Sequence, residues 1–161
     1  MNIGLRLGTS PRLARWVALP LRLVVGYGMA AHGYAKLAKG PAHFVDIVRA
    51  IGAPAPELLG RATIGIELAG GVAILLGALV PWVSVPLAVV LLVAMFSVHL
   101  PYGFSSVKLQ AVTAAGATFG QPGYEVDLLY LACLAALILG GAGPFSVDEW
   151  LASRSVKRPR R

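Results

Sequence analysis

The chain alternates long apolar runs with shorter polar connections, and four of the runs have the length of a membrane-crossing helix. A bilayer core about 30 Å thick needs about 20 apolar residues in one helix. Runs of that size cover roughly residues 13–35, 59–80, 82–100 and 125–142. The pattern therefore predicts an all-α fold, a transmembrane four-helix bundle.

The second and third runs follow each other without a charged residue, so their boundary has to come from another signal. From Leu68 to Val98 there are 31 residues without a charge. One straight helix of that length would rise roughly 46 Å, more than the bilayer core. Pro81 and Pro86 lie within the stretch, and proline removes a backbone donor and disturbs the preceding turn. We expect a helical hairpin broken around these prolines.

Two polar connections separate the runs. In the first, the apolar residues fall on one helical face, and Asp46 and Arg49 fall outside it; that face carries Phe44, Val45, Ile47, Val48 and Ile51. This favours a short interfacial helix between the first and second spans. The second connection, residues 102–125, is too polar to cross a bilayer, and we expect an external loop with partial helix.

The overall composition agrees with a membrane protein. Hydrophobic residues make up 57% of the 161 residues and charged residues 13%, and the mean hydropathy is +0.75. Soluble domains carry about 25% charged residues. The lipid bilayer is therefore the first expected partner.

The net charge of +7 reports topology rather than nucleic-acid binding, because the basic residues gather at the two ends. A nucleic-acid binder would carry them as a stripe on a soluble face. Residues 1–12 form an N-terminal segment, residues 13–151 the membrane domain, and residues 152–161 a basic tail. Both ends are expected in the cytoplasm by the positive-inside rule, which requires an even number of spans.

Small residues recur at every fourth position in two of the runs, and such rows let membrane helices approach closely. The row in the second run is Ala69, Ala73 and Gly77, beside Gly70 and Gly71, and the row in the fourth is Ala132, Ala136 and Gly140. We expect both rows to form helix contacts.

Two charged residues fall near the middle of the predicted bundle, Arg22 in the first span and Glu67 in the second. A lone charge there costs about 2.5–3.5 kcal/mol on insertion scales. We therefore predict an ion pair between Arg22 and Glu67. The pair can be a staple between two helices or part of a functional site, and buried pairs often add little net stability.

Further polar groups fall in the outer half. His32 and His99 come out at nearly equal depth, and Tyr130 lies between them and Glu67. With Arg22 and Glu67 they could line an outward-facing polar cavity that holds a quinone head group or only water. We predict no metal site, because Cys133 is the single cysteine and no clustered histidine motif accompanies it. Lys36 and Lys39 are expected to reach the outer head groups, and Asp148 and Glu149 to be solvated or to cap a helix.

Three stretches together resemble the DoxX family of small four-helix membrane proteins. The first carries Arg22, His32, Gly33, Lys36 and Leu37; the others are "GIELAGGVAILLG" at 65–77 and "EVDLLYLACLAALILGGAGPFSVDEWL" at 125–151. The resemblance implies a multi-pass protein of a bacterial plasma membrane. Members are described as subunits of quinone-linked oxidoreductases or as membrane partners in oxidative-stress complexes.

The resemblance implies an accessory or anchor subunit that works with a redox partner protein or as a homo-oligomer. No dinucleotide-binding fingerprint is present, so we expect no intrinsic cofactor beyond a bound quinone. Whether the chain is itself an enzyme stays open. The alternatives are a non-enzymatic assembly or folding factor, and a small transporter in which Glu67 titrates in a watery path.

Overall fold

A computed structural model describes residues 11–156, and this part of the chain is mostly helical. The α-helices are α1 (Pro11–Ala14), α2 (Ala18–Ala38), α3 (Pro41–Ala50), α4 (Pro56–Leu76), α5 (Val80–Ala94), α6 (Glu125–Gly140) and α7 (Val147–Val156). A 3-10 turn, Arg15–Val17, joins α1 to α2. A π-helical segment, Met95–His99, and a 3-10 turn, Leu100–Tyr102, continue α5.

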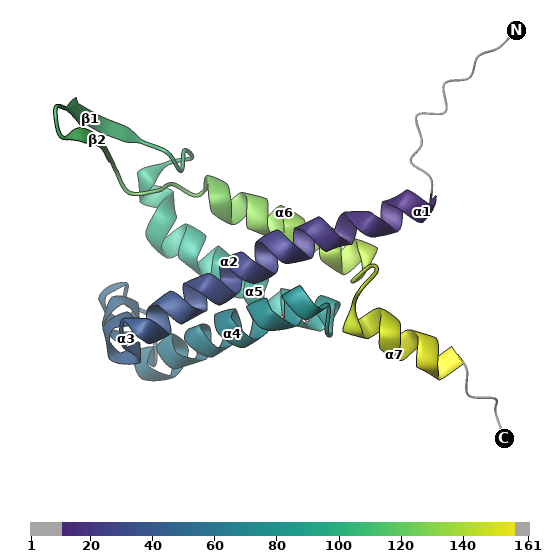
Figure 1. The fold of residues 1–161 in the computed structure, drawn as a ribbon. Helices are drawn as coiled ribbons and strands as arrows, with labels where there is room; N and C mark the ends of the chain where they lie inside the picture. The colour runs from purple at the N-terminus through teal and green to yellow at the C-terminus, as the bar shows by residue number, and fades with distance from the viewer. Residues whose placement is uncertain (1–10, 157–161) are drawn as a thin grey trace, which may run out of the picture.

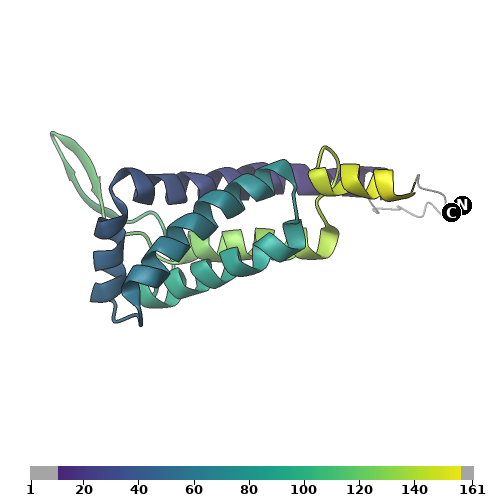
Figure 2. The same ribbon diagram turned by 90° about the horizontal axis from the view of Figure 1, so that it is seen from below.

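Four long helices lie side by side (Figures 1 and 2). Helix α4 packs against α2 on one side and against α5 on the other, and α6 packs against α5 and α2. Helices α1 and α7 lie at one end, which we name the terminal end. Helix α3 and a small β-hairpin lie at the opposite end, which we name the distal end.

The four predicted runs coincide with α2, α4, the α5 segment and α6, but they differ in how well they suit a bilayer. Two helical segments of residues 11–156 are long and apolar enough to cross a membrane, Pro56–Leu76 and Val80–Tyr102. Helix α2 carries Arg22, His32 and Lys36, and α6 has only 16 residues. The structure thus supports membrane helices, and crossing by α2 and α6 stays a prediction.

The short helix predicted between the first two spans is confirmed as α3. Its buried residues are Val45 and Val48, and Val45 packs on Gly60 of α4. The exposed Arg49 donates to Asp46 and to Glu57 of α4. Mainly the hydrogen bond to Glu57, and then the one to Asp46, raise the pKa of Arg49 above its usual value. Helix α3 is therefore bound to the start of α4 by apolar packing and by charge.

The turn between α4 and α5 lies earlier than predicted. Helix α4 ends at Leu76, and both Gly77 and Leu79 adopt positive φ, +67° and +51°. Pro81 stands in the first turn of α5, where a missing N–H costs nothing, and Pro86 lies inside the helix. The prediction that the two prolines make the break was wrong, because glycine adopts the left-handed conformation more readily.

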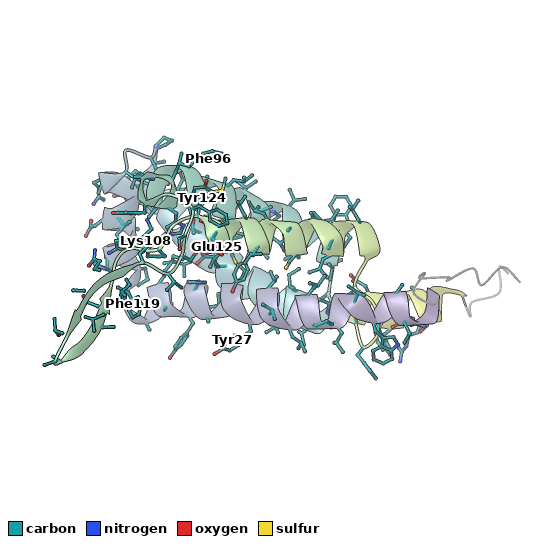
Figure 3. All side chains as sticks on the ribbon, turned by 90° about the horizontal axis from the view of Figure 1, so that it is seen from above. Tyr27, Phe96, Lys108, Phe119, Tyr124 and Glu125 are labelled. Atoms are coloured by element: carbon teal, nitrogen blue, oxygen red, sulfur yellow. The ribbon has the colours of Figure 1, made fainter. Side chains whose placement is uncertain are left out.

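The second connection contains a β-hairpin, so the prediction of a loop with partial helix was wrong and the fold is not purely α. Strand β1 (Leu109–Thr113) pairs antiparallel with β2 (Gly116–Phe119), with Val112 opposite Ala117. All strand residues are exposed, and the hairpin projects away from the helices at the distal end (Figures 1 and 3). β-branched Val112 and Thr113 favour a strand.

Small residues do form a close contact between two helices, but the predicted rows are not the residues that form it. Ala69 is exposed, as are Ala132, Ala136 and Gly140. The contact between α2 and α4 depends on glycines: a Cβ on Gly71 would lie 2.3 Å from the backbone nitrogen of Ala30, and one on Gly33 would lie 2.6 Å from that of Leu68. Gly70 faces the other way, against Leu87 of α5. Side chains this small let the two backbones touch.

Replacing Gly71 with alanine should destabilise the protein by about 1–3 kcal/mol, because the added methyl group meets rigid backbone and forces α2 and α4 apart. The matched control is Gly65→Ala on the same helix, where the new Cβ has nothing within 4 Å. Unfolding in detergent micelles, followed by tryptophan fluorescence, measures both. Equal stability of the two variants would contradict the glycine contact.

Candidate functional site

Arg22 lies at the terminal end and is bound by main-chain carbonyls rather than by a carboxylate. Its side chain is 2% exposed. A guanidinium has five N–H donors, and each meets a carbonyl oxygen at 2.8–3.2 Å. The acceptors are Ile74, Leu75, Ala142, Pro144 and Phe145.

These acceptors explain why Arg22 lies there. The last four carbonyls of a helix lack partners within the helix and form the negative end of its dipole. Arg22 donates to two of them in α4 and to three in the turn between α6 and α7. The predicted ion pair between Arg22 and Glu67 was therefore wrong, because the carbonyls use all the donors of Arg22.

Asp148 acts on the other side of the same turn. Its carboxylate accepts from the backbone nitrogens of Leu79 at 2.7 Å and Val80 at 3.0 Å, at the start of α5. Its own backbone nitrogen donates to the carbonyl of Gly77 at 3.0 Å. The N-terminus of a helix is the positive end of its dipole. Of the two roles predicted for Asp148, the structure supports capping.

Gly77 and Ser146 complete the terminal-end network. A Cβ on Gly77 would lie 2.7 Å from Cζ of Arg22 and 2.4 Å from Cβ of Ser146, so only glycine fits. Ser146 Oγ accepts from the backbone nitrogen of Glu149 at 3.1 Å and caps α7. The side chain of Glu149 pairs with Arg15. This end of the molecule is held by polar contacts between segments far apart in the sequence.

Glu67, on α4, is paired with Lys36 in the last turn of α2. Glu67 is 5% exposed, and Nζ of Lys36 also lies 5.0 Å from the ring centre of Phe44 in α3. The prediction that Lys36 extends to the head groups was wrong, because a buried carboxylate attracts it. This pair connects α2, α3 and α4.

His99 and Asp127 form a second pair at the distal end. Nδ1 of His99 lies 2.6 Å from Oδ2 of Asp127, which is 5% exposed in the first turn of α6. The sequence reasoning named His99 and missed Asp127. Within residues 11–156, the other ring nitrogen of His99, Nε2, has no hydrogen-bond partner. The pair thus offers one unused polar atom beside an apolar bundle.

The π-helical segment directs His99 toward Asp127. Leu87, Leu91 and Met95 form the buried line of α5, which faces its neighbours. In a regular α-helix, steps of four residues drift off such a line. A π-helical turn holds more residues and rotates each one less, so His99 stays near the buried line. Such segments recur at functional sites in proteins.

The remaining two predicted site residues differ in position. Tyr130, one turn after Asp127, is partly buried, and its hydroxyl would lie 1.9 Å from a Cβ on Gly28, so it packs on the backbone of α2. His32 is exposed on α2 and does not share an enclosed site with His99. Tyr27 also lies on an outward face of α2 (Figure 3). The structure brings the five predicted residues to separate places rather than into one cavity.

The distal polar groups offer proton and hydrogen-bond chemistry. In residues 11–156 there is no group of three or more histidine, cysteine or acidic side chains that could hold a metal ion. The His99 and Asp127 pair can accept or donate a hydrogen bond at Nε2. Arg22 cannot serve a ligand, because its five donors are in use.

Replacing Arg22 with methionine should cost about 3 kcal/mol or more, because buried carbonyls left without donors cost about 1–3 kcal/mol each. Arg22→Lys should recover part of the loss, since lysine offers three donors. Arg61→Met, on the exposed face of α4, is the control. Unfolding in detergent measures all three. A small effect of Arg22→Met would contradict the network.

The Lys36 and Glu67 pair can be tested with a double-mutant cycle. Lys36→Met should destabilise by about 2 kcal/mol, below the range for a fully buried pair because part of Lys36 is exposed. Adding Glu67→Gln should restore much of the loss, since no carboxylate then stays unpaired. Strictly additive effects in thermal unfolding would show that the two side chains are not coupled.

Comparison with known proteins identifies the family of the chain. Residues 17–100, more than half of the chain, match the family model described as DoxX. The match covers α2 through the π-helical segment and includes Arg22, Glu67 and His99. No curated protein and no solved structure shows significant similarity. The chain belongs to the DoxX family and is a membrane protein of that family.

Proposed function

We propose that the protein crosses a bacterial plasma membrane four times, through α2, α4, the α5 segment and α6, with the terminal end in the cytoplasm. Trp16, Trp82 and Trp150 are the three tryptophans of the chain, and all are exposed near the terminal end. Exposed Tyr34 and Tyr102 lie toward the distal end. Aromatic residues gather at both membrane–water interfaces. The two groups would then mark the two faces of the bilayer.

The polar groups of α2 are compatible with crossing. The charge of Arg22 is surrounded by carbonyls and that of Lys36 by a carboxylate, so neither must face lipid alone. The 16 residues of α6 rise about 24 Å, about 6 Å less than the core, and local thinning of the bilayer accommodates such a mismatch at modest cost. Four of the residues 157–161 are basic and follow α7, which fits a cytoplasmic terminal end.

Single cysteines test this topology in a Cys133→Ala background. Ala42→Cys on α3 and Ala115→Cys in the hairpin turn should react with a membrane-impermeant maleimide on intact cells. Ala78→Cys and Ser153→Cys should react only after the membrane is opened. Labelling of Ser153→Cys from outside would contradict the orientation, and unequal behaviour of Ala42→Cys and Ala115→Cys would contradict four spans.

We further propose that the protein is a membrane subunit of a quinone-linked redox complex and binds a quinone head group at the distal end. The observation that carries this proposal is the His99 and Asp127 pair: a partly exposed imidazole, held at Nδ1, with Nε2 unused beside apolar helices. Quinone head groups combine apolar rings with two oxygens that need hydrogen-bond partners. Tyr130 lies one helical turn from Asp127, but its hydroxyl is directed at Gly28 of α2, so His99 and Asp127 form the polar part of the proposed site.

An accessory role is supported by the chemistry of these side chains. A quinone must exchange electrons as well as protons, and His99 and Asp127 handle only protons. A partner carrying a redox cofactor would supply the electrons. The Lys36 and Glu67 pair then serves mainly to hold α3 against α2 and α4.

The test is the quinone content of protein purified from its native membrane. His99→Ala should lower the bound quinone at least tenfold, because it removes the only polar contact the pair offers. His43→Ala is the matched control, since His43 is exposed on α3. Extraction and mass spectrometry measure the content. Equal quinone in both variants, or none in the wild type, would remove the assignment. Recovery of a partner without quinone would favour an assembly factor.

A further inference from the structure

The direction of the hydrogen bond between His99 and Asp127 determines whether Nε2 of His99 donates or accepts a hydrogen bond. An ionised carboxylate is a hydrogen-bond acceptor only. A carboxylate at Oδ2 of Asp127, 2.6 Å away, places the hydrogen on Nδ1 of His99. In a neutral imidazole only one nitrogen is protonated, so Nε2 keeps a lone pair and accepts.

The position of Asp127 is fixed by the start of α6. The residue lies in the first turn of that helix. The turn before α6 is itself fixed, because Glu125 accepts from the backbone nitrogen of Ser106 at 3.0 Å. The start of α6, and with it Asp127, therefore has a defined position relative to His99.

The two redox states of a quinone differ in the partner they need. The oxidised form presents carbonyl oxygens, which only accept hydrogen bonds. The reduced form, a quinol, presents hydroxyl groups, which donate. Nε2 with a lone pair suits the hydroxyl and repels the carbonyl.

We propose that this site selects the quinol over the quinone, and that Asp127 is the positioning residue that sets the preference by fixing the histidine tautomer. The inference rests on the proposed quinone site and specifies the form of the ligand that occupies it. Asp127 does not touch the ligand; it acts through His99.

Binding of a short-chain ubiquinol and the matching ubiquinone to protein in lipid nanodiscs tests the proposal. The titration is done without oxygen at about pH 8.5, where imidazoles are generally neutral. The wild type should bind the quinol about tenfold more tightly, the effect of about 1.4 kcal/mol for one well-placed hydrogen bond. Equal affinities would overturn the tautomer preference and leave the quinone site in place. No binding of either form would overturn both.

The decisive variant is Asp127→Asn, because a side-chain amide can donate to Nδ1. The hydrogen of His99 then moves to Nε2, and the preference should reverse toward the quinone. Glu125→Gln is the matched control, a carboxylate of the same helical turn that binds Ser106 instead of His99, and it should keep the preference for the quinol. An unchanged preference in Asp127→Asn would overturn the role of Asp127.

A second measurement needs no ligand. Nitrogen-15 chemical shifts of the histidine rings report which nitrogen is protonated. The proposal expects one ring in the wild type to be protonated at Nδ1 and unprotonated at Nε2, and that signal should vanish in His99→Gln. The opposite tautomer would overturn the proposal even if Asp127→Asn did not fold.

Discussion

The arrangement of the helices depends on the guanidinium of Arg22. It brings together the C-terminal carbonyls of α4, the turn after α6 and the first part of α2, three segments that lie far apart in the sequence. Inside the protein, water cannot reach such carbonyls, and a buried carbonyl left without a donor costs about 1–3 kcal/mol. The arginine therefore replaces solvent at the point where two helices end inside the protein. Asp148 does the same for the amide groups at the start of α5.

The charged side chains at the two ends of the molecule have different partners. At the terminal end, charged side chains satisfy the backbone, and their donors and acceptors are consumed there. At the distal end, charged side chains pair with one another, as in Lys36 with Glu67 and His99 with Asp127. The pair of His99 and Asp127 leaves Nε2 of His99 unused. Ligand binding is therefore expected at the distal end, whereas the contacts at the terminal end stabilise the fold.

Much of the helical framework could be predicted, because the length of an apolar run and the position of charges are local properties. Partners across helices were harder to predict. Arg22 and Glu67 were assigned similar depths, but the depth of a residue does not say in which direction its side chain points around the helix axis. Lys36 contacts Glu67 from the same face of α2 that carries Gly33. Asp127 looked like an ordinary acidic residue in the first turn of a helix. A π-helical segment cannot be recognised from apolar periodicity. The orientation of His99 toward Asp127 could therefore not be predicted.

The order of synthesis gives the Arg22 network a further meaning. Three of its five acceptors belong to residues 142, 144 and 145, which are synthesised 120 residues or more after Arg22. Until then the guanidinium has only the carbonyls of Ile74 and Leu75 in α4 as partners. Completion of the turn after α6 thus supplies the last partners of Arg22, and a chain truncated before residue 142 would leave three of the five N–H donors unpaired.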